Sequence, residues 1–436
     1  MKVREISQCR SCRSESLVPI LSLGQQYVSD FVDGMDGVRE TVPLELVLCK
    51  GLSTSCGLLQ LKHTVSAKKL YTNYWYKSGV NESMRMALAG IAEKVETVTG
   101  LGAGDLVLDI GCNDGTLLRN YRTSDVTLVG FDPARNLATE AKQGTTHIIT
   151  DFFNSHAFQH HFGNEKARIV TSVAMFYDLD NPNEFVADVA QCLHRNGVWV
   201  IEMQYLPDML EKNAYDQICH EHLEYYCLLS ITPLVERHGL AVVDVELNSV
   251  NGGSFRVWVM HKNTSVPVQL GGAADRINNL VEREKNVGLS DTGTYESFAV
   301  RVTRGRRKLV DFVCGEVHDG KTVYVYGAST KGNTLLQYCG LDNTLITAAA
   351  ERNPDKWGKM TVGTQIPIIS ERQAREERPD YFLILPWHFL DVFVEREKDY
   401  LESGGQFIVP LPELRVVSDG DNDLGNSARA RTWSKA

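Results

Sequence analysis

The sequence predicts an α/β protein of several domains, and two observations lead to this expectation. The chain has 436 residues, more than one compact hydrophobic core usually organises. Short apolar runs that suit buried strands alternate with stretches of helical periodicity along most of its length. This alternation is typical of a sheet covered by helices on both faces.

The alternation is clearest in the middle of the chain. Apolar residues recur at spacings of three and four between residues 84 and 98, which predicts an amphipathic helix. Seven expected strands follow it, at 106–110, 126–131, 147–150, 168–173, 198–203, 241–247 and 254–260. Because the last two are joined by a short polar stretch, we expect them to form an antiparallel hairpin at one end of a doubly wound, seven-stranded sheet.

A second, smaller α/β unit is expected after a charged helical stretch at about 271–318. There the segment KTVYVYGASTKGN restarts the strand, loop and helix pattern, and four apolar runs follow it: LITAAAE, QIPII, YFLIL and GQFIVP. The final stretch lacks periodicity and is expected to be a mobile tail. The predicted domains are residues 1–70, 71–265 and 266–415, with the tail at 416–436.

Composition narrows the class of protein. Hydrophobic residues make up 43% and charged residues 23%, the balance of a soluble globular protein. The formal net charge of −10 argues against a general binder of nucleic acid or anionic membranes. No run approaches the roughly 20 apolar residues that span a bilayer, and the polar start does not resemble a signal peptide. We therefore expect a cytoplasmic protein with no nucleic-acid or membrane partner.

Four of the ten cysteines lie in the first 56 residues, as Cys9-x2-Cys12 and Cys49-x6-Cys56. A C-x2-C turn presents two sulfurs to one tetrahedral ion, whereas a disulfide-stapled secreted domain would be smaller and denser in cysteine. We expect the four thiolates to hold one structural zinc ion. The alternative is four free or packed cysteines.

The segment LVLDIGCNDGTLL at 106–118 places an apolar strand before a glycine turn that opens a helix. Gly111 and Gly115 allow the backbone to approach a ligand, and Asp109 stands at the carboxyl end of the strand, where open α/β sheets bind ligands. The pattern is not G-x-G-x-x-G, which makes a dinucleotide the weaker interpretation.

Two further acidic strand ends complete a methyl-donor pattern. Asp132, in VGFDP, can accept both hydroxyls of a ribose, while Asp151 and Phe152 can meet the amino group and the face of an adenine. A glycine turn with an acid, followed by an acid one unit later, is typical of class I S-adenosylmethionine-dependent methyltransferases. A generic doubly wound domain with unrelated acids is the alternative. The remaining residues expected at this cofactor site are Asn113, Pro133, Met175 and Tyr177.

The segment DQICHEHLEYY at 216–226 is the densest cluster of ionisable and aromatic side chains. His220 and His222 are two residues apart, unlike the i, i+4 pair of a helical zinc site. A histidine beside a carboxylate, here Glu221, suits proton abstraction because its ordinary pKa lies near physiological pH. A solvated surface cluster would explain the spacing equally well.

In the C-terminal region, GASTKGN follows an expected strand and opens an expected helix. Backbone N–H groups at a helix start, together with Ser329, Thr330 and Lys331, suit a phosphate. The segment is not a Walker sequence, and by itself it is a weak signal.

In order and spacing, five pieces of the chain resemble the nucleotide-sugar C-methyltransferases that modify deoxysugars. These are the CxxC start, YWYKSGVNESM at 74–84, the HEH segment, NGGSFRV at 251–257 and GASTKGN at 327–333. The resemblance runs from Cys9 to about Pro412. It implies an N-terminal zinc-binding module, a central S-adenosylmethionine domain and a C-terminal Rossmann-like domain. It also implies a 4-keto-6-deoxyhexose on a nucleoside diphosphate, such as dTDP, as the substrate; we expect a monomer or homodimer.

The resemblance also assigns roles to individual residues. It makes His222 the base that removes the proton next to the ketone, after which the enolate takes the methyl group from the sulfonium, at C-3 by our expectation. Glu221 and His220 accompany it in the site, and Tyr76 lines the sugar pocket. The other expected substrate-binding residues are Tyr74, Lys77, Ser78, Ser254, Arg256, Ser329, Thr330, Lys331, Glu351 and Arg352. Of these, Ser329, Lys331, Glu351 and Arg352 would hold the nucleotide part.

Two positions depart from the family pattern. Cys219 stands where many relatives have a tyrosine three residues before the base, so a hydroxyl that would bind the enolate oxygen or relay a proton is missing. The second cysteine pair is wider than usual. The alternatives to the expected reaction are an O-, N- or C-methyltransferase acting on another small metabolite, and a zinc-containing binding module with a degenerate methyltransferase fold.

Overall fold

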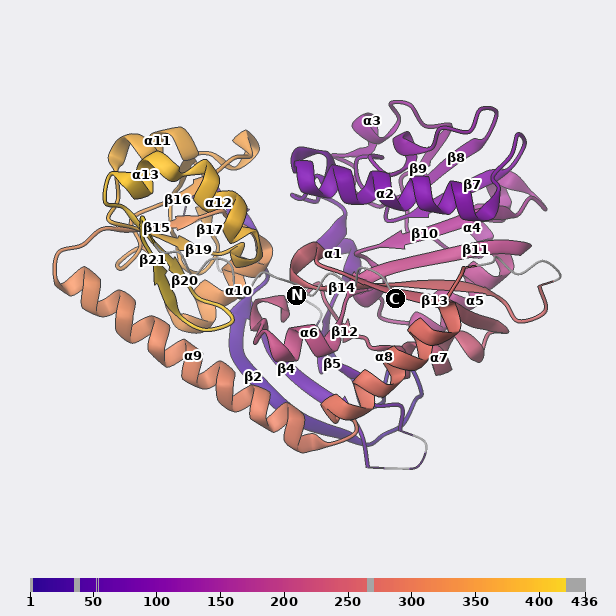
Figure 1. Ribbon diagram of the computed structural model, residues 1–436, viewed down its shortest axis with the longest axis horizontal. Coiled ribbons are helices and arrows are strands. Elements are labelled where there is room, and N and C mark those ends of the chain that lie inside the picture. The colour runs from indigo at the N-terminus through magenta and orange to yellow at the C-terminus, as the bar shows by residue number, and fades with distance from the viewer. Residues whose placement is uncertain (1–2, 35–39, 52, 54, 265–269, 421–436) are drawn as a thin grey trace. The chain divides into compact units, whose positions relative to one another are not determined.

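The computed structural model describes residues 3–34, 40–51, 53, 55–264 and 270–420. The chain forms two compact units, each assembled from segments that are separated in the sequence (Figure 1). The first unit contains Met1–Pro19, Leu46–Asp208 and Glu221–Thr294. The second contains Ile20–Glu45, Met209–His220 and Tyr295–Ala436.

The first unit is built on a seven-stranded sheet in the order β13-β14-β11-β10-β7-β8-β9. Its strands are parallel except β14, which is antiparallel to both neighbours, as the predicted hairpin requires. The bounds are β7 (Leu106–Ile110), β8 (Thr127–Phe131), β9 (His147–Ile149), β10 (Ala167–Val173), β11 (Leu193–Gln204), β13 (Leu240–Asn248) and β14 (Ser254–His261). All seven predicted strands, and the doubly wound fold class, are confirmed.

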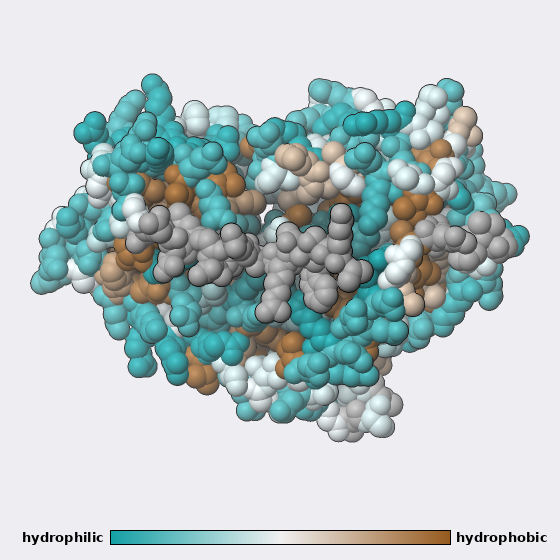
Figure 2. Space-filling view, in the orientation of Figure 1, coloured by the Kyte–Doolittle hydropathy of each residue, from teal (hydrophilic) through white to brown (hydrophobic). Residues whose placement is uncertain are grey.

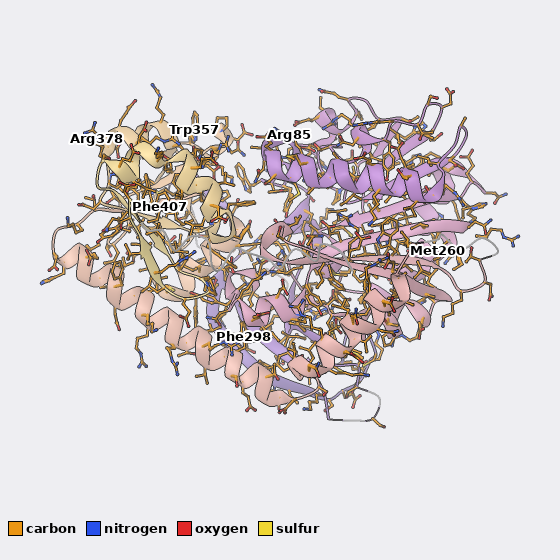
Figure 3. The ribbon with its side chains drawn as sticks, viewed as in Figure 1. Arg85, Met260, Phe298, Trp357, Arg378 and Phe407 are labelled. Atoms are coloured by element: carbon orange, nitrogen blue, oxygen red, sulfur yellow. The ribbon has the colours of Figure 1, made fainter. Side chains whose placement is uncertain are left out.

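Both faces of this sheet are covered because alternate strand residues are apolar on each side. Val198 and Val200 of β11 share a core with α2 (Glu82–Thr99), while Trp199 between them meets Phe176 on the opposite face. Met260 of β14, labelled in Figure 3, belongs to the α2 core. The other helices of the unit are α1 (Ala67–Tyr71), α3 (Ala138–Ala141), α4 (Ser155–Phe162), α5 (Pro182–Cys192), α7 (Leu228–Glu236) and α8 (Ala273–Val287).

The predicted helix at 84–98 lies within α2, and its ends have local causes. The side chain of Asn81 accepts the N–H of Ser83 at the start, and Gly100 adopts the left-handed conformation at the end. The charged stretch at 271–318 is also helical, but Gly288, again left-handed, ends α8 and separates it from α9 (Thr292–His318).

Two small sheets contain most of the strands of the N-terminal region. β1 (Val3–Glu5) pairs with β6 (His63–Val65), and a four-stranded sheet has the order β12-β5-β4-β2. Its members are β12 (Glu224–Tyr225), β5 (Leu59–Leu61), β4 (Thr41–Cys49) and β2 (Leu17–Tyr27). The pairing of β5 with β12 joins the cysteine-bearing segment to the segment that follows His222.

The second unit contains a six-stranded sheet in the order β18-β16-β15-β19-β20-β21. Only β21 is antiparallel to its neighbour. The bounds are β15 (Val323–Tyr326), β16 (Ala349–Glu351), β18 (Ile368–Ser370), β19 (Tyr381–Ile384), β20 (Gln406–Val409) and β21 (Arg415–Val417). Its helices are α10 (Thr330–Cys339), α11 (Glu371–Glu377), α12 (Leu390–Arg396) and α13 (Lys398–Glu402), with most of α9, on which Phe298 is buried (Figure 3). A short pair, β3 (Phe31–Val32) with β17 (Met360–Thr361), completes this unit, and α6 (Leu206–Glu211) links the two units in sequence.

Two expectations for this unit need correction. The run LITAAAE is a strand only at its end, because Asp342 accepts the N–H and hydroxyl of Thr344 and holds the start in a turn. The predicted tail cannot begin at residue 416, since Val416 and Val417 pair with β20; residues 421–436 lie outside the described part of the chain.

The surface fits the composition. On the face seen in Figure 2, hydrophilic residues predominate and hydrophobic residues form scattered patches. Among the described residues, no helix has both the length and the apolar character needed to cross a membrane.

Candidate functional site

The turn after β7 has a conformation that excludes most side chains. Gly111 has a φ of +76°, and a Cβ atom there would lie 2.9 Å from Cγ of Met175. Gly115 has a φ of +78°, and its Cβ would lie 2.8 Å from the carbonyl oxygen of Ala141. Both positions therefore need glycine, and Met175 packs directly on the turn.

Asp109 lies inside the sheet just before this turn. It is 3% exposed and accepts a hydrogen bond from Oγ1 of Thr171 at 2.6 Å. Burial raises the pKa of its carboxyl group to about 7; the Thr171 bond opposes the rise and the charge of Asp132 adds to it. This carboxyl group therefore titrates near neutral pH.

Asp132, after β8, has a carboxylate that the backbone orients. Its Oδ2 accepts the N–H of Asn113 and its Oδ1 accepts the N–H of Ala134, each at 2.8 Å. Burial raises its pKa, and the two backbone hydrogen bonds oppose that rise. Each oxygen keeps a further lone pair for a ligand, so the glycine turn and Asp132 form one oriented edge.

Residues 74–80 lie against this edge. Asn113 accepts the N–H of Ser78 at 2.9 Å and donates to the carbonyl oxygen of Tyr76 at 3.0 Å. Asp114 accepts the N–H of Gly79 at 2.7 Å. The side chain of Tyr76 is 46% exposed beside the turn. The structure thus brings Tyr76 and Ser78 to the predicted cofactor residues.

The neighbouring predicted residues are tied to the same edge or lie open beside it. Tyr74 exchanges backbone hydrogen bonds with the side chain of Asn136 at 2.8 and 3.0 Å, and Nζ of Lys77 lies 4.0 Å from Glu140. The N–H of Asp132 donates to the carbonyl oxygen of Ile149, so β8 and β9 end together. The residues that follow β8 and β9 there are the half-buried Pro133 and the exposed Asp151 and Phe152.

His222 is held beside the loop that follows β10. Its half-buried ring lies 4.4 Å, centroid to centroid, from the ring of Tyr177 in η3 (Phe176–Asp178). The N–H of Leu223 donates to the carbonyl oxygen of Tyr177 at 2.8 Å, and the hydroxyl of Tyr71 donates to the carbonyl oxygen of Glu221 at 3.1 Å. Because Met175 in the same loop packs on Gly111, His222 lies at the edge where β7, β8 and β10 end.

Three other predicted residues have partners within the protein. His220 is 3% exposed with its Nε2 3.1 Å from the carbonyl oxygen of Val42. The hydroxyl of the buried Ser254 donates to a backbone carbonyl in the preceding turn. Nε of Arg256 donates to Glu202 at 2.7 Å across neighbouring strands. Each of these three side chains therefore has a hydrogen-bond partner within the protein, and its position does not require a bound ligand.

The N-terminal cysteines converge. The Sγ atoms of Cys9, Cys12, Cys49 and Cys56 all lie within 4.8 Å of one another. The Cys9–Cys56 and Cys12–Cys49 distances are 3.7 and 3.4 Å, close to the spacing that tetrahedral Zn–S bonds of about 2.3 Å require. The four sulfurs therefore fit one zinc ion, and the wide second pair closes the site as well as a short one would.

In the second unit, the glycines of GASTKGN serve close packing. A Cβ on Gly332 would lie 2.5 Å from Leu385, and one on Gly327 would lie 2.9 Å from Pro386. The Oγ of Ser329 caps α10 by accepting the N–H of Gly332 at 3.0 Å. Thr330 and Lys331 are half-buried in the first turn of that helix.

Glu351, at the end of β16, ties that strand to the GASTKGN turn. Its Oε2 accepts the N–H of Ala328 at 3.0 Å, and its Oε1 accepts the N–H of Arg352 at 2.8 Å. The side chain of Arg352 is exposed.

Sequence reasoning missed a buried polar pair in this unit. Nε1 of Trp387 donates to Oδ2 of Asp216 at 3.2 Å. Burial raises the pKa of Asp216, which the positive charge of Lys331 opposes, and burial lowers the pKa of His388 to about 3. The signal for this pair was PWH directly after an apolar strand, the position at which the other candidate residues stand.

Comparisons with known proteins agree with this arrangement. The chain matches family models described as "Putative zinc binding domain" over residues 9–71, "Methyltransferase domain" over 82–245 and "C-methyltransferase C-terminal domain" over 249–412. It is 34% identical over 424 residues to the C-methyltransferase NovU of Streptomyces niveus, across 95% of this chain and 98% of that protein.

Solved structures are more distant. Magnesium protoporphyrin IX methyltransferase (ChlM) from Synechocystis PCC 6803 with bound SAH is 13% identical, with a TM-score of 0.34 over 42% of this chain and 89% of that one. An S-adenosylmethionine-dependent methyltransferase from Clostridium acetobutylicum is 11% identical, with a TM-score of 0.31 over 41% and 92%.

The match to NovU spans nearly the full length of both chains, and the three family models cover the cysteine cluster, the seven-stranded sheet and the C-terminal unit in the same order. The rival interpretation of a binding module with a degenerate fold is thereby set aside. The chain belongs to the zinc-containing, S-adenosylmethionine-dependent C-methyltransferases.

Proposed function

We propose that this enzyme adds a methyl group to the carbon next to the ketone of a nucleoside-diphosphate-linked 4-keto-6-deoxyhexose, at C-3, with His222 as the general base. The observation that carries the proposal is the placement of the His222 ring. It is held against Tyr177 at the edge where the glycine turn and Asp132 also lie.

The residues at that edge fit S-adenosylmethionine. Gly111 and Gly115 leave room for a ligand to approach the backbone, and Asp132 presents an oriented carboxylate to a ribose. The exposed Asp151 and Phe152 are available for the adenine. Bound there, the cofactor supplies an electrophilic methyl group on a sulfonium.

The ketone makes the chemistry feasible for an imidazole. An unactivated C–H is far too weakly acidic, whereas the carbonyl spreads the resulting charge onto oxygen. His222 takes the proton, and the electron pair of the enolate forms the new C–C bond as the C–S bond breaks. S-adenosylhomocysteine leaves, and the proton stays on His222 until solvent removes it. Glu221 stands beside the base, and Tyr76 lines the sugar pocket.

The second unit would bind the nucleotide part. The first turn of α10 offers backbone N–H groups with Thr330 and the charge of Lys331, which suits a diphosphate. Glu351 and Arg352, at the end of β16, would meet the nucleoside. The similarity to NovU supports carbon as the methylated atom, because the chain aligns with that C-methyltransferase along nearly its whole length.

Proton exchange separates deprotonation from methyl transfer. With the ketosugar and S-adenosylhomocysteine in deuterated water, the wild-type enzyme should exchange the proton next to the ketone. His222→Ala should lose that exchange by about 10²–10⁴-fold, the usual contribution of a positioned base, and keep its affinity for S-adenosylhomocysteine. Cys219→Ala is the control and should still exchange. Exchange that persists without His222 and vanishes without Cys219 would mean that the base is misassigned.

A further inference from the structure

The zinc knuckle contains a buried arginine that the metal does not need. Arg10 lies between Cys9 and Cys12 in sequence and is 1% exposed. Its guanidinium donates to the carbonyl oxygen of Leu61 at 2.6 Å and to Oγ1 of Thr64 at 2.7 Å. A tetrahedral zinc ion at this site would be bound by the four sulfurs alone. The buried guanidinium of Arg10 is not a metal ligand and therefore has another role.

The contacts of Arg10 lead to the strand that pairs with the His222 segment. Leu61 is the last residue of β5, and its N–H donates to the carbonyl oxygen of Leu223 at 2.8 Å. The N–H of Leu223 donates in turn to the carbonyl oxygen of Tyr177, also at 2.8 Å. Leu223 is therefore fixed from both sides, by the zinc module and by the loop after β10. His222 is the residue just before Leu223 in the chain.

Gln60 links the same arginine to a zinc ligand. Its Nε2 donates to Sγ of Cys9 at 3.2 Å, while its Oε1 accepts the backbone N–H of Arg10 at 3.1 Å. Gln60 is also paired with Glu224 across β5 and β12. One side chain thus connects the metal-binding loop, Arg10 and the strand that follows His222.

The charge of Arg10 is paired with Asp180, whose Oδ1 lies 3.5 Å from Nε of Arg10. Glu224, two residues after His222, is 1% exposed, and within the described residues neither carboxylate oxygen has a hydrogen-bond partner. Burial raises the pKa of Glu224, and the positive charge of Arg10 opposes that rise. An arginine that donates to Leu61 and Thr64 in two directions holds the end of β5 and the segment after it more specifically than a point charge would.

We infer that Arg10 is a positioning residue for catalysis. Through Arg10 and the β5–β12 pairing, the zinc knuckle fixes the ring of His222 against Tyr177. The inference rests on the proposed role of His222 as the base. Every contact in the path lies within the first unit. A base displaced by about 1 Å can lose about 10²-fold in rate, so a zinc site remote from the chemistry acts on turnover through geometry.

Arg10→Lys tests this inference, because lysine keeps the charge but cannot reproduce the guanidinium's hydrogen bonds to Leu61, Thr64 and, at 3.3 Å, Oε1 of Gln60 together. We expect kcat and the exchange of the substrate proton to fall in parallel by about tenfold to a hundredfold. KM, zinc content and affinity for S-adenosylhomocysteine should stay unchanged. Arg13→Lys is the matched control: Arg13 flanks the same knuckle, but it is exposed and donates to Asn181 at 2.9 Å.

A spectroscopic readout makes the test independent of turnover. In protein with nitrogen-15-labelled histidine, the His222 signal is identified by its loss in His222→Ala. Arg10→Lys should shift or broaden that signal, and Arg13→Lys should not. If His222→Ala kept proton exchange, the proposed function would fail, while the His222 signal would still report whether Arg10 positions the ring.

Wild-type exchange and an unmoved His222 signal in Arg10→Lys would overturn the inference. If Arg10→Lys does not fold or does not bind zinc, Thr64→Val tests the inference instead. It removes one acceptor of the guanidinium and should cause a smaller loss of kcat in the same direction, and unchanged kcat would overturn the inference.

Discussion

Two carboxyl groups at adjacent strand ends differ in their hydrogen-bond partners and therefore in their roles. Asp132 accepts two backbone N–H groups, which favour its ionised form. Asp109 is buried with one hydroxyl donor, Thr171, and burial raises its pKa to about 7. Burial raises the pKa of both carboxyl groups, but two backbone donors oppose the rise at Asp132, whereas Asp109 changes charge near neutrality.

Asp132→Ala should weaken binding of S-adenosylhomocysteine by at least about tenfold. The substitution removes two hydrogen bonds to a charged group, each contributing roughly 1.5–3 kcal/mol. Calorimetric titration measures the change, and Glu165→Ala, an exposed carboxylate before the other end of β10, is the control. Equal affinity in the Asp132 variant would place the cofactor elsewhere.

The raised pKa of Asp109 predicts that the stability of the protein depends on pH. Its folded pKa of about 7 lies above the unfolded value of about 3.9. Its contribution to the free energy of unfolding is therefore complete below the unfolded pKa and is lost as the pH rises through 7. Between pH 5 and pH 8 the ligand-free wild type should therefore lose about 2–3 kcal/mol more free energy of unfolding than Asp109→Asn. Urea denaturation at both pH values checks this, and parallel losses would contradict it.

At the scale of the element, periodicity predicted the framework and missed the contacts that complete the site. Apolar runs located all seven strands of the first sheet and the helix α2, because burial on one or both faces leaves a repeating pattern. The bonds of Asn113 to Tyr76 and Ser78 leave no such pattern, since they join one side chain to a distant backbone. The same holds for the Trp387–Asp216 pair.

The NGG turn before β14 predicts a strong effect of a single methyl group. Gly253 has a φ of +135°, and a Cβ there would lie 2.3 Å from a carboxylate oxygen of Asp208. Gly253→Ala should destabilise the protein by about 1–3 kcal/mol. Gly90→Ala, in the exposed interior of α2 with nothing within 4 Å of its Cβ, should stabilise it by about 0.5–1 kcal/mol. Thermal unfolding of both variants tests these two predictions, and equal shifts in melting temperature would contradict them.

At the scale of the whole molecule, the sequence pattern predicted the fold class but treated domains as contiguous. Each compact unit instead contains segments from separate parts of the sequence: residues 20–45 and 209–220 belong with the C-terminal unit. The break between His220 and Glu221 divides the HEH segment, and no spacing rule reveals it, because a hydrophobic period reports burial and not the unit in which a residue is buried.

Zinc should be required for the stability of the first unit. Cys9→Ser with Cys12→Ser removes two of four ligands, and because binding energy of a structural metal is folding energy, the variant should lose its zinc and melt at lower temperature. Metal analysis and calorimetry measure both. The pair Cys192→Ser and Cys314→Ser, outside the cluster, should keep one zinc per chain; a well-folded, metal-free wild type would contradict the prediction.

Whether a carbon of a nucleotide-linked ketosugar receives the methyl group can be read from one spectrum. The enzyme is supplied with S-adenosylmethionine carrying a carbon-13 methyl group and with a dTDP-4-keto-6-deoxyhexose labelled with carbon-13 in the sugar. If C-3 next to the ketone accepts the methyl group, the methyl signal should be split by one-bond carbon–carbon coupling to C-3. A methyl signal without that coupling, as in an O-methyl product, or transfer only to acceptors that lack an adjacent ketone, would contradict the proposed function.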